Sequence, residues 1–205
     1  MTTPSDTEIA PPAGFDAHAF WAEHKGKITL YAALFAVALA SFAIYQITTQ
    51  RKLAEVQQAF AQAGTEEDFQ QIVQKFPHTP AAGNAALLLA EKLRATKKYD
   101  ESAAALRTLI EQYPEYPLVD GAWISLAATQ EAQGKTDEAL ATYQQIVTKF
   151  SDRFTAPQAL LAQAMILKGK GKPDEAKRIF ENVKSQFPDS FFALEALQEL
   201  QLLKK

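Results

Sequence analysis

A two-residue motif returns along this chain at one fixed interval. An aromatic residue, followed by proline in three of four cases, occurs every 37 residues, at Phe76-Pro77, Tyr113-Pro114, Phe150-Ser151 and Phe187-Pro188. A period of this length is typical of repeat architectures, in which each unit buries its apolar face only against its neighbours. The chain is therefore predicted to be a stack of similar units, and this architecture points to binding rather than catalysis.

Each interval carries a second signature, that of two closely crossing helices. A small residue is followed four positions later by a large apolar one, at Ser102 and Leu106, Ala139 and Tyr143, and Ala176 and Phe180. Small residues are needed where the helices of a pair cross, and the large residue fills the gap to the next repeat. With Trp123 ahead of the middle copy, the spacing resembles the tetratricopeptide pattern. We expect Trp123 and Phe180 to be buried between helices.

The region from Leu53 onward has helical periodicity throughout, and no segment alternates with a period of two. Each proline of the recurring motif should end a helix, because proline lacks an N–H donor and forces the preceding residue out of the α region. Thr65, followed by three acidic residues, is the expected cap of the first of these helices. The expected helices cover about 66–76, 80–96, 99–113, 117–133, 136–150, 155–170, 173–187 and 190–204.

An uncharged stretch of 21 residues, Ile28 to Thr48, precedes the repeats. As a helix it would span roughly 30 Å, which is the hydrocarbon thickness of a bilayer, and lysine and arginine residues close both ends. Two alternatives are a buried core helix and a signal peptide cleaved after Ala40. The apolar run continues beyond Ala40, and the segment before it is long and acidic, so an uncleaved transmembrane anchor is favoured.

These segments divide the chain into a disordered tail (1–19), a membrane anchor with its flanks (20–52) and a repeat domain (53–205). The predicted fold class is all-α. A single N-terminal transmembrane helix is followed by a tetratricopeptide-like α-solenoid, whose last helix caps the final repeat.

Composition argues against several classes of function. The net charge of −3 gives no sign of a nucleic-acid-binding surface. Cysteine is absent, which excludes disulfides and thiolate chemistry, and the three histidines lack metal-ligand spacing. No nucleophile arrangement is apparent, so we expect no enzyme activity, no metal and no cofactor.

The first helix of each pair should line the inner groove of the solenoid. On that face Leu87, Ile124 and Leu161 recur at the 37-residue step. The residues expected around them, all polar except Met165, are Asn84, Glu91, Arg94, Glu131, Gln158, Met165 and Lys168. An apolar ridge with polar flanks suits an extended or helical peptide. The alternative, that these residues pack inside the solenoid, is equally compatible with the periodicity.

Within the apolar stretch, Ala32, Ala36 and Ala40 lie four residues apart on one helix face. Such small-residue stripes let transmembrane helices approach closely. Because the segment contains six alanines, the stripe can also arise by chance.

The arrangement of tail, anchor and repeats resembles the YfgM-like ancillary subunits of the bacterial Sec translocon. The local likeness lies in Phe20-Trp21-Ala22-Glu23, in Gly26-Lys27 before the anchor and in Arg51-Lys52 after it. The resemblance implies a single-pass inner-membrane protein with a cytoplasmic N-terminus and a periplasmic repeat domain. Its partners would be translocon subunits, a membrane-anchored periplasmic chaperone or secreted clients. The charges flanking the anchor do not decide the orientation, because each side holds two cations.

The expected function is therefore that of a membrane-anchored protein–protein interaction adaptor, assisting periplasmic chaperones and secreted clients at the translocon. The alternative is a repeat scaffold for another cell-envelope complex, without client binding.

Overall fold

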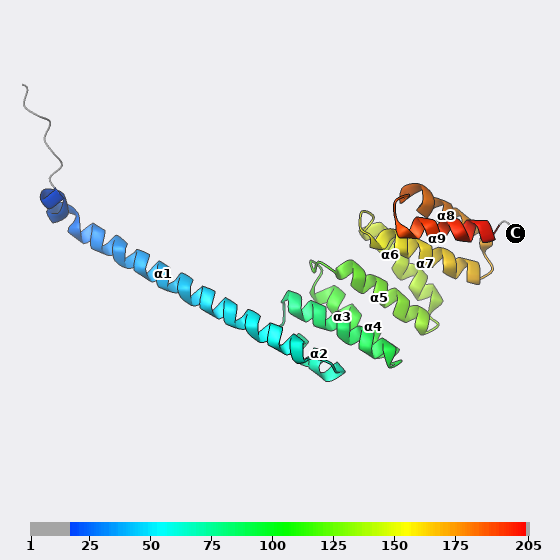
Figure 1. The fold of residues 1–205 in the computed structure, drawn as a ribbon, viewed down its shortest axis with the longest axis horizontal. Coiled ribbons are helices and arrows are strands. Elements are labelled where there is room, and N and C mark those ends of the chain that lie inside the picture. Colours follow the sequence, from blue (N-terminus) through cyan, green and yellow to red (C-terminus); the bar gives the residue numbers. More distant parts are fainter. Residues whose placement is uncertain (1–16, 204–205) are drawn as a thin grey trace, which may run out of the picture. The chain divides into compact units, whose positions relative to one another are not determined.

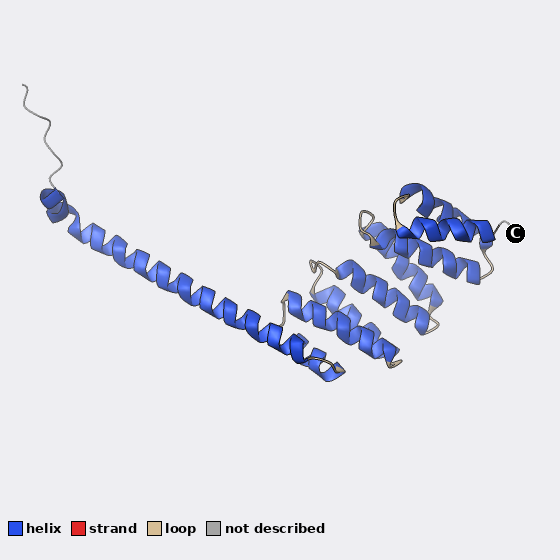
Figure 2. Ribbon diagram, viewed as in Figure 1, coloured by secondary structure: helices blue, strands red, loops and turns tan. Residues whose placement is uncertain are grey.

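The computed structural model describes residues 17–203, and within that range it contains nine α-helices and no strand. The all-α prediction is confirmed (Figures 1 and 2). The helices are α1 (Ala17–Gln62), α2 (Glu66–Lys75), α3 (Pro80–Ala95), α4 (Tyr99–Gln112), α5 (Val119–Ala132), α6 (Thr136–Lys149), α7 (Thr155–Gly169), α8 (Pro173–Gln186) and α9 (Phe191–Leu202).

Contacts divide the chain into two compact units, with the boundary between Ala54 and Glu55. In the first unit, the apolar part of α1 is exposed along its length. Among the described residues, only the segment Phe20–Gln62 has the length and apolar character of a membrane span. Of the expected tail, residues 1–16 lie outside the described range, and residues 17–19 belong to α1.

The serine and threonine hydroxyl groups of the apolar segment find partners within α1 itself. Thr29 Oγ1 donates to the carbonyl of Lys25 at 2.9 Å, and Ser41 Oγ donates to that of Val37 at 2.8 Å. Thr48 and Thr49 both donate to the carbonyl of Tyr45. Because hydrocarbon offers no hydrogen-bond partners, such internal pairing is what a membrane helix requires of its polar side chains.

In the second unit, α3 and α4, α5 and α6, and α7 and α8 form three successive helix pairs, and each helix packs against the next along the chain. The final helix, α9, covers α7 and α8, as predicted for a capping helix. At the other end, Val56, Ala59 and Phe60 of the last turns of α1 pack against Phe69 and Ile72 of α2. The tetratricopeptide-like solenoid is confirmed.

Helix ends follow the sequence signals closely. Phe76, Tyr113, Phe150 and Phe187 are each a C-terminal cap whose N–H donates to the carbonyl four residues earlier. Thr65 caps α2 as expected, and the Thr65 N–H donates a hydrogen bond to Asp68 Oδ2 at 2.9 Å. Helix α5 starts two residues later than predicted, because Val119 N–H closes a turn on the Tyr116 carbonyl.

The two residues expected to be buried behave differently. Phe180 is fully buried beside Leu160, Leu161 and α9. The prediction for Trp123 was wrong, since its ring is only partly buried between two core clusters. The Lys149 ammonium lies 4.5 Å from the centre of that ring, in a cation–π contact that needs an accessible face.

The solenoid has two unlike edges (Figure 1). We call the side with the turns inside each pair the turn edge, and the side with the loops between pairs the loop edge. On the turn edge, a polar side chain from each turn donates a hydrogen bond to a carboxylate of the preceding layer of helices. These contacts join Lys98 Nζ to Glu66 Oε2 at 2.6 Å, Gln133 Nε2 to Asp100 Oδ1 at 2.8 Å and Lys170 Nζ to Asp137 Oδ1 at 2.6 Å. The turn edge is thus a ladder of contacts between layers.

Candidate functional site

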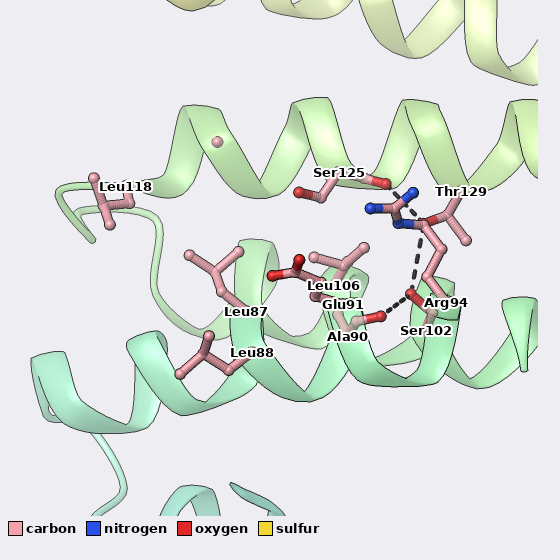
Figure 3. Close-up of a pocket in the computed structure, with 11 residues that line it drawn as sticks. Leu87, Leu88, Ala90, Glu91, Arg94, Ser102, Leu106, Leu118, Ser125 and Thr129 are labelled. Atoms are coloured by element: carbon pink, nitrogen blue, oxygen red, sulfur yellow. Dashed lines mark hydrogen bonds between the residues drawn. The ribbon is translucent and has the colours of Figure 1, made fainter. Parts of the chain in front are cut away.

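A groove of about 400 Å³ lies between α3 and α5, with α4 as its floor (Figure 3). Leu87 and Leu88 of α3 form one wall, and Leu106 of α4 lies at the bottom. Leu118, which precedes α5 and is 52% exposed, stands at one end, and Arg94 lies at the other beside Ser102 and Thr129. The groove is therefore mainly apolar, with the Glu91 carboxylate beside Leu106 and the Arg94 guanidinium at one end.

The groove is open because two repeat positions hold smaller residues here than later in the chain. On the floor, Leu106 stands where the following repeats have the buried rings of Tyr143 and Phe180. On the wall, Gly121 stands where the next repeat has Gln158. A Cβ atom placed on Gly121 would meet no neighbouring atom within 4 Å, so the missing side chain leaves space rather than relieving a clash.

Two charged side chains of the groove, Glu91 and Arg94, are available for a ligand, whereas the hydroxyl groups beside Arg94 are not. The Ser102 and Thr129 hydroxyls are buried and donate to the carbonyls of Ala90 and Ser125, at 2.7 Å each. Both protons are therefore used within the fold. Glu91 and Arg94 are exposed and form no ion pair with any residue of 17–203. These two side chains can meet a polar or charged group of a ligand.

Three of the residues predicted to line the groove, Leu87, Glu91 and Arg94, are brought together by the structure. Asn84 lies one turn earlier on α3, where its Oδ1 accepts a hydrogen bond from the Tyr116 hydroxyl. The remaining predicted residues belong to later repeats and lie outside this groove: Ile124, Glu131, Gln158, Leu161, Met165 and Lys168.

The three apolar positions at the 37-residue step are not equivalent. Leu87 and Ile124 are half-buried, whereas Leu161 is 6% exposed and belongs to the core around Phe180. Leu161 therefore packs inside the solenoid and is not part of an exposed ridge.

The polar residues predicted for the later repeats also differ in role. The Tyr143 hydroxyl donates to Glu131 Oε1 at 2.6 Å, and burial raises the pKa of Tyr143 far above its ordinary value. Lys168 forms an ion pair with Glu199 of α9. Met165 is exposed, and Gln158 is half-buried. Glu131 and Lys168 thus have partners in the fold, unlike Glu91 and Arg94.

Among the lining residues of the groove that are not buried, sequence reasoning missed four: Leu88, Leu118, Gly121 and Ser125. Gly121 carried a usable signal, because a glycine inside a helical pattern needs a packing or functional reason. The other three lie where helical periodicity alone does not separate wall from surface. In the first unit, Ala32, Ala36 and Ala40 are all exposed on α1.

The sequence matches the tetratricopeptide repeat-like domain family over residues 18–202. The chain belongs to that family. Tetratricopeptide-like repeats are protein–protein interaction scaffolds and are typically non-catalytic. Among the described residues, no three histidine, cysteine, aspartate or glutamate side chains gather as metal ligands would.

Solved structures share this tetratricopeptide-like fold, among them one of low sequence identity. A crystal structure of MamA aligns with 76% of this chain and 80% of its own, at 13% identity and a TM-score of 0.52. At that identity the likeness concerns the fold alone. No curated protein sequence matches the chain.

Proposed function

We propose that this protein is a membrane-anchored adaptor that binds polypeptide segments in the groove between α3 and α5. The observation that carries the proposal is the groove itself, which is apolar and opened by Leu106 and Gly121 at positions that larger residues occupy in the next repeat. Apolar grooves on helical scaffolds are recurrent peptide-binding surfaces.

The bound segment would place apolar side chains against Leu87, Leu88 and Leu118. A volume of about 400 Å³ suits two or three side chains of a peptide rather than a folded partner. Glu91, in the middle of the groove, and Arg94, at one end, would then fix its direction by contacting polar groups of the segment, because charged side chains give specificity more than affinity.

The membrane anchor would determine where in the cell the groove binds polypeptides. We propose a tail over residues 1–19, an anchor over 20–52 and a repeat domain over 53–205, with a cytoplasmic N-terminus and a periplasmic repeat domain at the inner membrane. The exposed apolar surface of α1 and the internally paired hydroxyls support the membrane assignment. The resemblance in residues 20–52 supports a place beside the Sec translocon, a chaperone and secreted clients.

The direct test is photocrosslinking in cells from the rim of the groove. A photoreactive amino acid replaces Leu88, which is 40% exposed in α3. The matched control carries the same group at Thr108, which is exposed on α4 and does not line this groove. A third variant combines the Leu88 probe with Gly121→Gln, which fills the wall with the residue of the next repeat.

We expect the probe at position 88 to capture polypeptides. Gly121→Gln should abolish this capture, and the probe at position 108 should capture none. Translocon subunits or secreted proteins among them would support the specific assignment. Capture of one invariant envelope partner would support the scaffold alternative. Equal capture from positions 88 and 108, or capture unchanged by Gly121→Gln, would refute the groove as the binding site.

A further inference from the structure

The loop edge carries a cluster of exposed aromatic residues that the groove does not use. Phe154, just before α7, is 69% exposed, and Phe191 and Leu194 of α9 are 68% and 62% exposed. The half-buried Phe192 joins them, with ring centres 5.2 Å from Phe154 and 5.9 Å from Phe191. We call these four residues the aromatic patch.

The fold does not require this much exposed apolar surface. The core beneath the patch is closed by Ala193, Ala196 and Leu200 on the opposite face of α9. Single exposed apolar residues are common on protein surfaces, but a contiguous group of them indicates an interaction site. The loop before α7 and the start of α9 lie at the loop edge (Figure 1), and none of the four patch residues lines the groove between α3 and α5.

The charges around the aromatic patch are mostly negative and unused. Asp152 and Asp189 each lie two residues before an exposed phenylalanine, and Glu195 lies one helical turn after Phe191. None of these three carboxylates forms an ion pair within residues 17–203. Arg153 is the one cation in the two loops. On the turn edge, by contrast, Glu66, Asp100 and Asp137 are all engaged by the following layer.

The extent of the patch argues for a short segment as its occupant. Two phenylalanines and a leucine, each about two-thirds exposed, offer roughly 400 Å² of apolar surface. A stable protein complex buries about 800 Å² on each partner, so the patch is too small to hold a second copy of the chain by itself. Anionic lipid would be repelled by the three carboxylates.

We propose that the aromatic patch is a second docking site, which binds a short amphipathic segment whose apolar face is flanked by lysine or arginine. The apolar side chains of the segment cover Phe154, Phe191 and Leu194. Its cations meet Asp152, Asp189 and Glu195. The site is independent of the groove, so a partner held here leaves the groove free.

The absence of cysteine allows a local reporter to be placed beside the patch. Ser151→Cys, at an exposed loop position, is labelled with an environment-sensitive dye in the full chain, reconstituted in phosphatidylcholine nanodiscs. The probe is a 14-residue peptide of leucine and lysine with its leucines at helical spacing. A matched peptide has glutamate in place of every lysine, and empty nanodiscs measure how much peptide the lipid removes.

We expect the lysine peptide to change the dye signal with saturation, and the glutamate peptide to bind at least tenfold more weakly. The pair Phe154→Ser and Phe191→Ser should weaken binding of the lysine peptide at least tenfold. The pair Asp152→Asn and Asp189→Asn should weaken it and flatten its dependence on salt, because fewer charges remain to be screened. Leu202→Ser, at the far end of α9 and 55% exposed, is the matched control and should bind normally.

Three results would overturn the proposal: equal binding of the two peptides, full binding by the Phe154→Ser and Phe191→Ser variant with an unchanged melting curve, or loss of binding in Gly121→Gln. Dimerisation of the parent chain that the two serine changes abolish would assign the patch to a second copy instead. Because Gly121→Gln disables only the groove, failure of the patch and failure of the groove are distinguishable.

Discussion

The interval between α3 and α5 and the interval between α5 and α7 are built from the same repeat positions, yet the first holds smaller side chains than the second. Leu106 and Gly121 line the first, whereas Tyr143 and Gln158 take their places in the second. The helices that frame both intervals keep the same step along the chain. A repeat protein can therefore create a site by shrinking side chains at two positions, without changing its backbone plan.

The largest effect should come from removing an aromatic residue that fills an interval. Phe180 is 0% exposed, so Phe180→Ala should lower the free energy of unfolding by about 3–5 kcal/mol. Leu106 is likewise 0% exposed, so Leu106→Ala should also be costly, at about 2–5 kcal/mol, although fewer buried atoms are removed than from Phe180. Thermal unfolding of the full chain in detergent, followed by circular dichroism, gives both values. A Phe180→Ala variant of unchanged stability would contradict the complete burial of that ring.

Gly83 of α3 should not tolerate a larger side chain, in contrast to Gly121 of α5, where a Cβ atom meets open space. A Cβ atom on Gly83 would lie 2.7 Å from Cε2 of the buried Tyr116 ring, which is also held by its hydrogen bond to Asn84. Such overpacking costs about 1–3 kcal/mol, which exceeds the gain of up to about 1 kcal/mol in helix propensity. Gly83→Ala should therefore lower the unfolding temperature. Gly83→Ala combined with Tyr116→Leu tests the cause, since the smaller side chain should recover part of the loss.

A third change concerns α7, where the third repeat departs from the first two. Gln163 is 6% exposed, and its Nε2 has no hydrogen-bond partner among the described residues. The equivalent positions hold Leu89 and Leu126. Gln163→Leu should raise the free energy of unfolding by about 1–2 kcal/mol, because it removes a buried unpaired amide. A lower unfolding temperature would show that the Gln163 amide has a partner after all.

Filling the groove should affect stability least among the core and groove changes. Gly121→Gln meets open space and improves helix propensity, so stability should change by no more than about 1 kcal/mol, in the stabilising direction. The same variant should lose peptide capture. A marked loss of stability would mean that the space beside Gly121 is smaller than the groove requires.

The smallest expected effect is on the turn edge and depends on pH. The hydrogen bond from Lys170 holds the pKa of Asp137 below its ordinary value of 3.8. The folded state therefore binds this proton less readily than the unfolded state, and the contact contributes fully above about pH 4 and is lost at lower pH. Asp137→Asn should unfold at a lower temperature than the parent at pH 7, with the gap closing near pH 2. A gap that stays constant with pH would exclude the Lys170 contact as its cause.

The helical plan could be predicted from sequence because its signals are local. Thr65 and the Phe-Pro pairs act through their own backbone neighbours, so they placed helix ends to within about two residues. The groove could not be predicted from local signals, because it depends on how equivalent residues differ between repeats. Treating Leu87 and Leu161 as equivalent overlooked their neighbours, since the ring of Phe180 packs with Leu161 whereas Leu106 leaves space beside Leu87.

Two further features depend on tertiary contacts that spacing does not reveal. Asp100 and Asp137 lie at helix starts, where capping alone accounts for a carboxylate, but the structure joins them to the next layer. Trp123 is likewise only partly buried, because one face of its ring contacts the Lys149 ammonium instead of the core. Residue type predicts burial well only where the surrounding residues are known.

The ladder on the turn edge has a direction that bears on how such a chain can change in length. Each carboxylate meets a turn from the next layer, and Gln133 and Lys170 occupy the same place in their repeats. Excision of residues 116–152, one full period, would present Lys170 to Asp100 in the same register. The shortened protein should still close its ladder, but α7 would face α3 with Gln158 in place of Gly121. A genetic deletion of this kind would therefore conserve the architecture while erasing the peptide site, so repeat number and binding activity can be inherited separately.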